Sequence, residues 1–223
     1  NLQTGELERI LRPPIGEGDQ GRLYAVAISP DGSRVAVGGF TGAPGSADHP
    51  IYLFDRTDGR LLQRSRGYAN VVNQLAFSAD GKRLAAAFGD GVGLRLLAAT
   101  ALTEELARDD DCRVSSYGVD FDPAGRLVAS CEDGQLRLYD AKGQRIARRQ
   151  VEGGEQPFGV AFSPDGTRIA VGFNDSTAVT VVSGRDLSLL YRADTGFATN
   201  GSLSSVAWSR DGERLHAGGR FDR

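Results

Sequence analysis

Few residues in the chain could bind a metal or act as nucleophiles, and their spacing does not build a site. The candidates are His49, His216, Cys112 and Cys131, and they lack the spacing of a metal motif such as C-x2-C or H-x3-H. Neither histidine has the sequence context of a catalytic base beside a nucleophile. We therefore expect no metal, no cofactor and no catalytic residue, and hence a non-enzymatic segment.

The two cysteines allow two interpretations. A pair of cysteines is no disulfide framework, and Cys131 occupies a small-residue position that Gly39 and Gly172 fill in related segments. A reducing compartment is then the simpler expectation. However, Cys112 precedes one expected strand and Cys131 ends the next, which places both thiols at the same rim. A redox pair is therefore the alternative.

Two loops resemble ligand sites only in part. Gly89 to Gly93 has the glycine spacing of a phosphate loop but leads into no helix, so it has no helix N-terminus to bind an anion. Asp109 to Asp111 lacks the alternating ligands and the glycine of a calcium loop. We interpret both as connections between strands.

The overall charge excludes a strong field for nucleic acid or membranes. The chain has 26 basic and 29 acidic residues, and it has no apolar run near the ~20 residues that span a bilayer. We therefore expect no nucleic-acid partner and no membrane association. Two arginine clusters lie on expected outer strands, where charge prevents edge-to-edge pairing. They are Arg60, Arg64 and Arg66, and Arg145, Arg148 and Arg149.

These residues are held by a repeat that runs along the chain. The segments 25–39, 74–88, 118–132, 159–173 and 205–219 align without a gap, and their turn glycines, from Gly32 to Gly212, recur at a mean interval of 45 residues. Each segment alternates apolar and small residues, makes a turn of the type Ser-Pro-Asp-Gly, and continues with small residues. This pattern predicts a β-hairpin in every repeat.

Two more strands follow most hairpins. We expect third strands at 51–55, 93–97, 135–140 and 178–182, and fourth strands at 60–65, 102–107, 145–150 and 187–191. Residues 5–11 have the pattern of another fourth strand. The chain also contains no methionine and begins at Asn1. Together these observations predict that some repeats lie outside the given sequence.

The series resembles the WD40 family of β-propellers in a diverged bacterial form, over nearly the whole chain. The turns carry the resemblance, together with Phe54-Asp55 and Tyr139-Asp140, which stand where that family has Trp-Asp; Leu97-Ala98 and Val182-Ser183 depart from it. The resemblance implies an all-β fold of four-stranded antiparallel blades, with five repeats visible of a seven-bladed ring. Residues 1–223 form one propeller segment, with repeats at about 5–55, 60–97, 102–140, 145–182 and 187–219, the last incomplete.

The resemblance also locates a candidate binding surface at the mouth of the central channel. Five residues stand at one position of the repeat, five before the residue that opens each turn: Tyr24, Asn73, Tyr117, Phe158 and Ser204. Loop residues expected at the same rim are Tyr68, Phe197, Arg22 and Arg113. Aromatic side chains around one opening suit protein or peptide recognition. The alternative is that they fill gaps between blades.

The expected function is a non-catalytic scaffold or sensor that binds a protein or peptide at this rim. By resemblance to WD40 regions of large bacterial proteins, it regulates a covalently linked effector domain, which can itself be an enzyme. The alternative is a TolB-like or lactonase-like propeller that is periplasmic or enzymatic. The expected location is cytoplasmic, or periplasmic if a signal peptide has been removed.

Overall fold

The computed structural model describes residues 3–14, 21–43, 45–196 and 198–221, and this part of the chain contains strands and no helix. Since the described residues form strands alone, they include no helix that could span a bilayer. The eighteen strands form four four-stranded antiparallel sheets and one two-stranded sheet. Each sheet is a meander in which consecutive strands pair, as the repeat predicts.

The strands of the first two sheets follow the predicted order. The first sheet comprises β1 (Arg22–Ile28), β2 (Arg34–Phe40), β3 (Tyr52–Asp55) and β4 (Leu61–Arg64). The second comprises β5 (Val72–Phe77), β6 (Arg83–Phe88), β7 (Leu94–Ala98) and β8 (Ala101–Asp109).

The remaining sheets repeat that order. The third comprises β9 (Ser116–Phe121), β10 (Leu127–Cys131), β11 (Gln135–Tyr139) and β12 (Arg145–Gln150). The fourth comprises β13 (Pro157–Phe162), β14 (Arg168–Phe173), β15 (Val179–Ser183) and β16 (Leu189–Arg192), and the last pair is β17 (Gly201–Trp208) and β18 (Leu215–Phe221). All eight expected third and fourth strands from residue 51 onward are confirmed, with ends that differ by at most a few residues.

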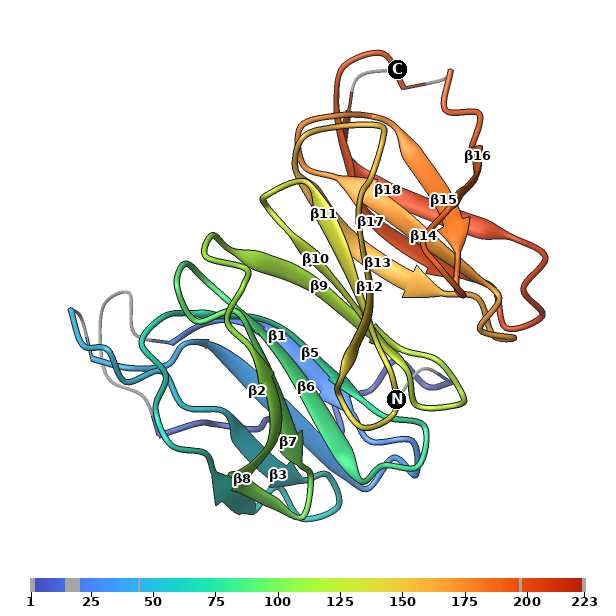
Figure 1. Ribbon diagram of the computed structural model, residues 1–223. Helices are drawn as coiled ribbons and strands as arrows, with labels where there is room; N and C mark the ends of the chain where they lie inside the picture. Colours follow the sequence, from blue (N-terminus) through green and yellow to red (C-terminus); the bar gives the residue numbers. More distant parts are fainter. Residues whose placement is uncertain (1–2, 15–20, 44, 197, 222–223) are drawn as a thin grey trace.

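The sheets follow one another as blades along an arc (Figure 1). The first strand of each sheet packs against the first strand of the next, in the order β1, β5, β9, β13 and β17. These five strands therefore line the inner side of the arc, and the fourth strands lie on its outer side. The described residues do not close a ring, and a total of seven blades stays a prediction.

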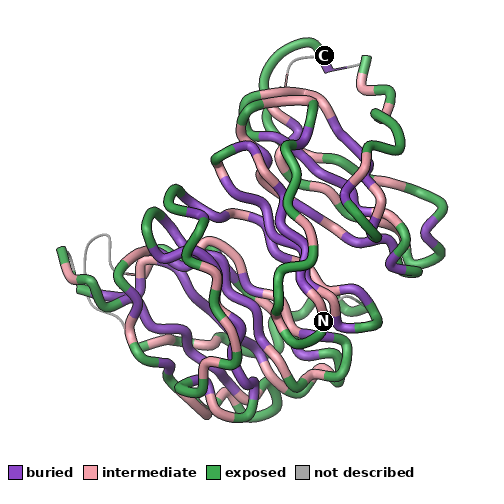
Figure 2. Tube along the Cα trace, viewed as in Figure 1, coloured by how far each residue is buried: buried purple, intermediate pink, exposed green. Residues whose placement is uncertain are grey.

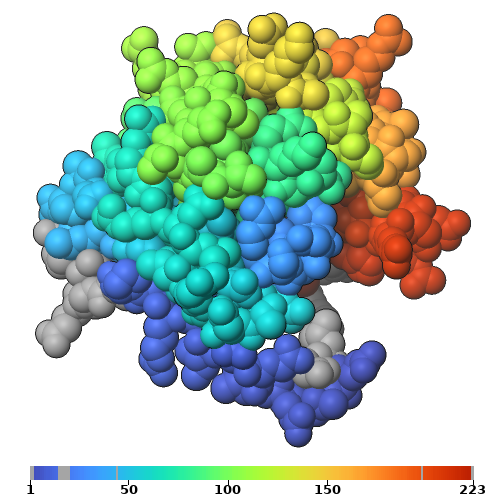
Figure 3. Space-filling view, turned by 90° about the horizontal axis from the view of Figure 1, so that it is seen from below, coloured from blue at the N-terminus to red at the C-terminus, as the bar shows by residue number. Residues whose placement is uncertain are grey.

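The expected strand at residues 5–11 is wrong, because that segment is not part of any sheet. A fourth strand needs a third strand to pair with, and the described residues provide none beyond β18. The segment instead lies against the first sheet, where Arg9 donates a hydrogen bond to the Asp58 carbonyl and Leu11 packs against an apolar cluster of β2 and β3 that includes Phe54. Figure 3 shows this deep-blue segment along one side of the molecule.

The core lies between neighbouring sheets and is built mainly from their second and third strands, with residues of the first strands added (Figure 2). Alanines at 85–87 are fully buried, with Leu75, Leu84 and Leu97 packed toward the first sheet and Leu94 and Leu96 toward the third. Small side chains in β6 let the sheets approach closely, and the larger ones fill the layers between them. This packing supports the predicted role of the small-residue strand.

The Ser-Pro-Asp-Gly turns are closed by their own side chains. In the first turn the Ser29 hydroxyl donates to Asp31 at 2.6 Å, Asp31 accepts the Ser33 amide, and Gly32 has a φ of 70°. These hydrogen bonds lower the pKa of Asp31 to about 2. The hydrogen bonds of the turn alone explain why an aspartate occupies this position, as expected from the sequence.

Four arginines at one position of the turn join each sheet to the next. Each guanidinium donates to the carbonyl of the turn glycine in the following sheet and lies over an aromatic ring of that sheet. The four sets are Arg34 with Gly81 and Phe77, Arg83 with Gly125 and Phe121, Arg126 with Gly166 and Phe162, and Arg168 with Gly212 and Trp208. This repeated contact holds the blades in a common orientation.

Candidate functional site

The five residues of the repeated rim position surround one opening. Tyr24, Asn73, Tyr117, Phe158 and Ser204 line a cavity of about 280 Å³ on the inner side of the arc. We call it the mouth cavity. The expectation that sequence position would bring these residues together is therefore met, although their contact with a partner stays a prediction.

Each of the five lies in a β-bulge of its first strand. The register between first and second strand shifts between Leu23 and Ala25, and at the matching places in the other four sheets. A bulge leaves a residue out of the ladder and changes the direction of its side chain. Five equivalent bulges thus turn five side chains toward one opening.

The aromatic residues of the mouth form a surface that is partly open and partly packed. The rings of Tyr117 and Phe158 stack across the boundary between two sheets, with centroids 4.4 Å apart and planes inclined by 23°. Tyr24 is 55% exposed, and its ring meets Phe40 edge-on. The Tyr117–Phe158 pair therefore contributes to packing between blades, the alternative that the sequence left open, while the cavity still gives access to it.

Asn73 holds a fixed place in the mouth cavity. Its side-chain amide donates to the Ser116 carbonyl of the next sheet at 2.9 Å. On the same strand, the Gln74 side-chain carbonyl accepts the amide of Val119 at 3.2 Å. These two bonds fix the spacing of β5 and β9 beneath the mouth.

The additional rim residues are placed differently. The expectation that Tyr68 projects at the rim is wrong: its side chain is buried, with its ring centroid 4.4 Å from that of Phe88. Backbone hydrogen bonds between Tyr68 and His49 in both directions turn this segment into the core. Arg22 and Arg113 are exposed but do not line the mouth cavity, and Phe197 lies outside the described residues.

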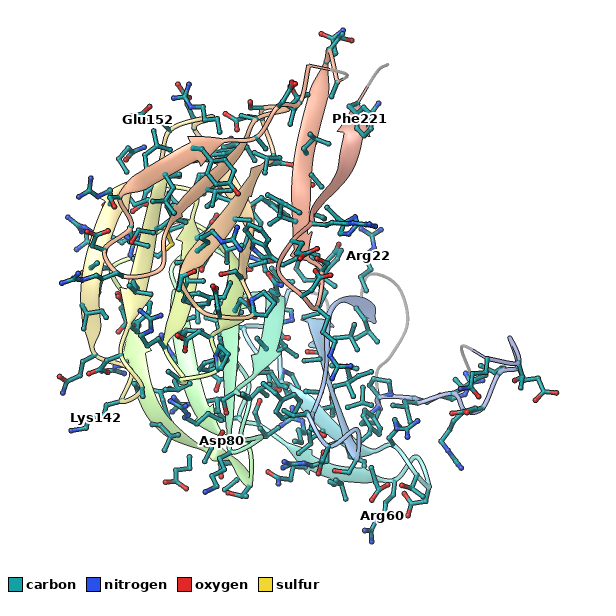
Figure 4. The ribbon with its side chains drawn as sticks, turned by 90° about the vertical axis from the view of Figure 1, so that its right-hand side faces the viewer. Arg22, Arg60, Asp80, Lys142, Glu152 and Phe221 are labelled. Atoms are coloured by element: carbon teal, nitrogen blue, oxygen red, sulfur yellow. A yellow bond between two sulfur atoms is a disulfide. The ribbon has the colours of Figure 1, made fainter. Side chains whose placement is uncertain are left out.

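The two rims of the molecule are formed by different sets of loops (Figure 4). Asp80, in a glycine turn, and Lys142, in a turn between third and fourth strands, lie at one rim, whereas Glu152 and Phe221 lie toward the other. The mouth residues stand near the starts of the first strands. They therefore belong to the end where the chain passes from one blade to the next, which is also where the loops vary most in length.

A second cavity adjoins the mouth and was not expected from the sequence. It has a volume of about 380 Å³ and shares the wall residues Gln74, Val160 and Val206 with the mouth cavity. We call it the lower cavity. Asp120 lies in its wall, at the position that alanine occupies in the other four repeats: Ala27, Ala76, Ala161 and Ala207. This departure from the repeat is the signal in the sequence that could have pointed to Asp120.

The two cysteines form a disulfide, with Cα atoms 6.0 Å apart. Both are buried, and the bond ties the connection before β9 to the end of β10. The predicted placement at one rim of one blade is confirmed, and of the two interpretations the structure supports the pair. The expectation of two separate thiols is wrong, because the turn between β9 and β10 returns Cys131 to the start of β9.

The remaining candidates have partners that explain them. In the part of the chain that is described, no three His, Cys, Asp or Glu side chains gather as metal ligands. The Asp109 to Asp111 segment binds arginines: Arg145 pairs with Asp109 and Asp111 at 2.9 and 2.6 Å, and Arg95 pairs with Asp110 at 2.7 Å. These aspartates therefore stabilise the outer edge of the second and third blades.

Comparisons with known proteins agree with this architecture. The family model described as "WD domain, G-beta repeat" matches residues 59–92 and 109–140. An uncharacterized WD repeat-containing protein of Synechocystis sp. is 30% identical over 157 residues, which cover 70% of this chain and 42% of that protein. The chain is also similar to the Intraflagellar transport protein 122 homolog of Danio rerio, at 25% identity over 84% of this chain and 14% of that protein.

The chain is also similar to a plant protein. The Small ribosomal subunit protein RACK1y of Oryza sativa is 30% identical over 135 residues, which cover 57% of this chain and 37% of that protein. The chain thus spans less than half the length of each of these relatives. Repeat spacing, sheet topology and these similarities agree, and the chain is therefore a WD40-repeat protein whose repeats fold as successive β-propeller blades.

Proposed function

We propose that this chain is a non-catalytic scaffold that binds a protein or peptide partner at the mouth cavity. Its WD40 relatives indicate a protein-interaction scaffold in general terms. The observation that carries the specific proposal is the convergence of five bulged residues on one opening. A rigid sheet framework that presents side chains at one site suits binding of a partner with little loss of entropy.

The chemistry of the mouth supports a peptide or protein ligand. Stacked Tyr117 and Phe158 and exposed Tyr24 offer large aromatic area with few rotatable bonds, and such residues dominate the energy of many interfaces. Asn73 and Ser204 add polar groups that can pair with a peptide backbone.

The test is a binding comparison among three proteins. The triple variant Tyr24→Ala, Tyr117→Ala and Phe158→Ala removes the aromatic surface, and Tyr191→Ala removes a similarly exposed tyrosine from β16 on the outer side. A partner is first captured with the wild-type chain and then titrated against each protein. We expect at least a tenfold loss of affinity for the triple variant and none for Tyr191→Ala. Equal affinity of all three would reject the mouth as the binding site.

We also propose that the propeller regulates further domains of a longer protein. The proposal comes from the resemblance to WD40 regions of large bacterial proteins, and among the relatives named above the match covers 14% of the Intraflagellar transport protein 122 homolog. The test is an activity or binding assay of the full-length product with and without the triple variant. If the mouth variant leaves every activity of the full-length protein unchanged, the regulatory role is rejected.

A second candidate is an extracytoplasmic propeller of the TolB-like or lactonase-like kind, and the disulfide favours it. Disulfides persist in oxidising compartments and are rare in the cytosol of mesophiles. The experiment is to denature host cells and to treat the denatured protein with a maleimide of large mass, with and without prior reduction. An oxidising location predicts modification of Cys112 and Cys131 only after reduction, whereas a cytosolic location predicts modification without reduction.

A further inference from the structure

Asp120 is an acidic group in the wall of the lower cavity, and no cation of the described residues forms an ion pair with it. Its side chain accepts a hydrogen bond from the Phe162 amide at 2.7 Å, and among the described residues it has no ion-pair partner. The strands packed around it, β5, β10, β13 and β17, contain no charged side chain.

The charged groups on its segment and in the cavity wall do not pair with this carboxylate. Asp122 on the same segment is itself negative and is paired with Arg126 at 2.7 Å. Arg210 lies in the wall of the lower cavity, but it is exposed and forms no ion pair with Asp120. Burial is the main reason that the pKa of Asp120 is raised to about 6. Asp120 is thus a partly buried carboxylate in the wall of the lower cavity, without an ion-pair partner among the described residues.

We propose that the lower cavity binds a cationic group, an ammonium or a guanidinium, with Asp120 as its counter-ion. This inference rests on the proposed function and specifies its ligand: the partner inserts a lysine or arginine side chain through the mouth. The mouth and the lower cavity share three wall residues, so the two cavities adjoin.

The geometry along β9 and β13 suits such a side chain. Tyr117 and Asp120 are three residues apart, at most about 10 Å along an extended strand. A long, flexible stem can pass the stacked pair of Tyr117 and Phe158, whose ring faces and edges accommodate methylenes and cations. The charged end then reaches a carboxylate in a partly desolvated site, where an ion pair is stronger than at the surface.

The probe for this proposal is n-butylammonium, with 1-butanol as its uncharged counterpart. The amide of Phe162 reports binding by NMR because it donates to Asp120. We expect n-butylammonium, and not 1-butanol, to shift this amide saturably near pH 7. We also expect its affinity to fall about tenfold near pH 5, since protonation of Asp120 removes the counter-ion.

Two variants separate a specific site from general electrostatics. Asp120→Asn removes the charge but keeps an oxygen that can accept from Phe162, and Glu104→Gln removes the same charge from an exposed position on β8. We expect Asp120→Asn to lose at least tenfold in affinity for n-butylammonium and Glu104→Gln to match the wild type. The proposal is overturned if n-butylammonium shows no saturable shift, or if Asp120→Asn binds as well as the wild type.

Failure of the cation proposal can be told apart from failure of the proposed function. If a captured partner loses affinity for the triple mouth variant but binds Asp120→Asn as tightly as the wild type, the mouth remains the binding site and the cation proposal fails. If the partner ignores the mouth variant while n-butylammonium still needs Asp120, the mouth proposal fails and the cation site stands.

Discussion

The guanidinium of Arg126 lies over the ring of Phe162 in the next blade, with its Cζ atom 5.7 Å from the ring centroid. The same side chain pairs with buried Asp122 at 2.7 Å and donates to the carbonyls of Gly166 and Gly184. One arginine therefore closes its own turn and joins two blades. Arginines at the equivalent position of three other turns contact the following sheet in the same way, so this contact recurs along the whole arc.

Replacing Arg126 should destabilise the arc strongly. We expect Arg126→Ala to lower the free energy of unfolding by about 3 kcal/mol, because it leaves Asp122 buried without its partner. Arg214→Ala is the matched control: it occupies the equivalent turn position after β17, is exposed, and has no side-chain partner among the described residues. Urea denaturation should show a change near zero for this control. Equal losses in both variants would contradict the proposed bridging role.

Reduction of the disulfide should loosen the third blade. Cys112 and Cys131 are separated by 19 residues, and closing a loop of that size stabilises a fold by roughly 3 kcal/mol. We expect a reductant to lower the thermal midpoint of the wild type and to leave that of the double variant Cys112→Ser and Cys131→Ser unchanged. Two reactive thiols in the denatured, unreduced protein would show that the bond is absent.

The charge of Asp120 should make stability depend on pH. A pKa raised from 3.8 to about 6 means that the folded state binds the proton more tightly, so this contribution is present at low pH and is lost as the pH rises through about 6. We expect Asp120→Asn to be more stable than the wild type near pH 8, by up to about 3 kcal/mol, and close to it near pH 4. Denaturant titrations at both pH values measure this difference. A pH-independent difference would mean that the charge is not the cause.

The close approach of the first strands should not tolerate an added methyl group. A Cβ atom on Gly118 would lie 2.3 Å from the Phe158 carbonyl oxygen, whereas a Cβ atom on Gly218 would meet nothing within 4 Å. We expect Gly118→Ala to cost about 2 kcal/mol and to separate the stacked rings of Tyr117 and Phe158. Gly218→Ala is the neutral control, and thermal denaturation compares the two. If Gly118→Ala is as stable as Gly218→Ala, the strands are not in such close contact.

Much of the fold could be predicted because the repeat is local and periodic. The turn chemistry from Ser29 to Gly32, the alternation along each first strand and the small residues of each second strand are visible in sequence, and the third and fourth strands follow from them. The strand expected at residues 5–11 failed for a nonlocal reason: a strand pattern is not enough when no partner strand is beside it.

The sequence predicted where the site residues lie in the fold better than it predicted their burial and their hydrogen-bond partners. The repeat placed Phe158 and its four counterparts around one opening, but the bulges that turn them there depend on pairing between strands. Tyr68 was misplaced because its burial follows from backbone bonds to His49. Asp120 could have been found as the one charge in an alanine position, yet its burial and lack of a counter-ion appear only once β9 and β13 are packed.

The most direct test of the account is amide hydrogen exchange of the wild-type chain with and without its bound partner. Binding at the mouth predicts slower exchange in the bulges of β1, β5, β9, β13 and β17, with little change in the outer strands β4, β8, β12 and β16. Protection confined to the outer strands, with the bulges around Tyr117 and Phe158 unaffected, would contradict the claim that the mouth cavity is the binding site.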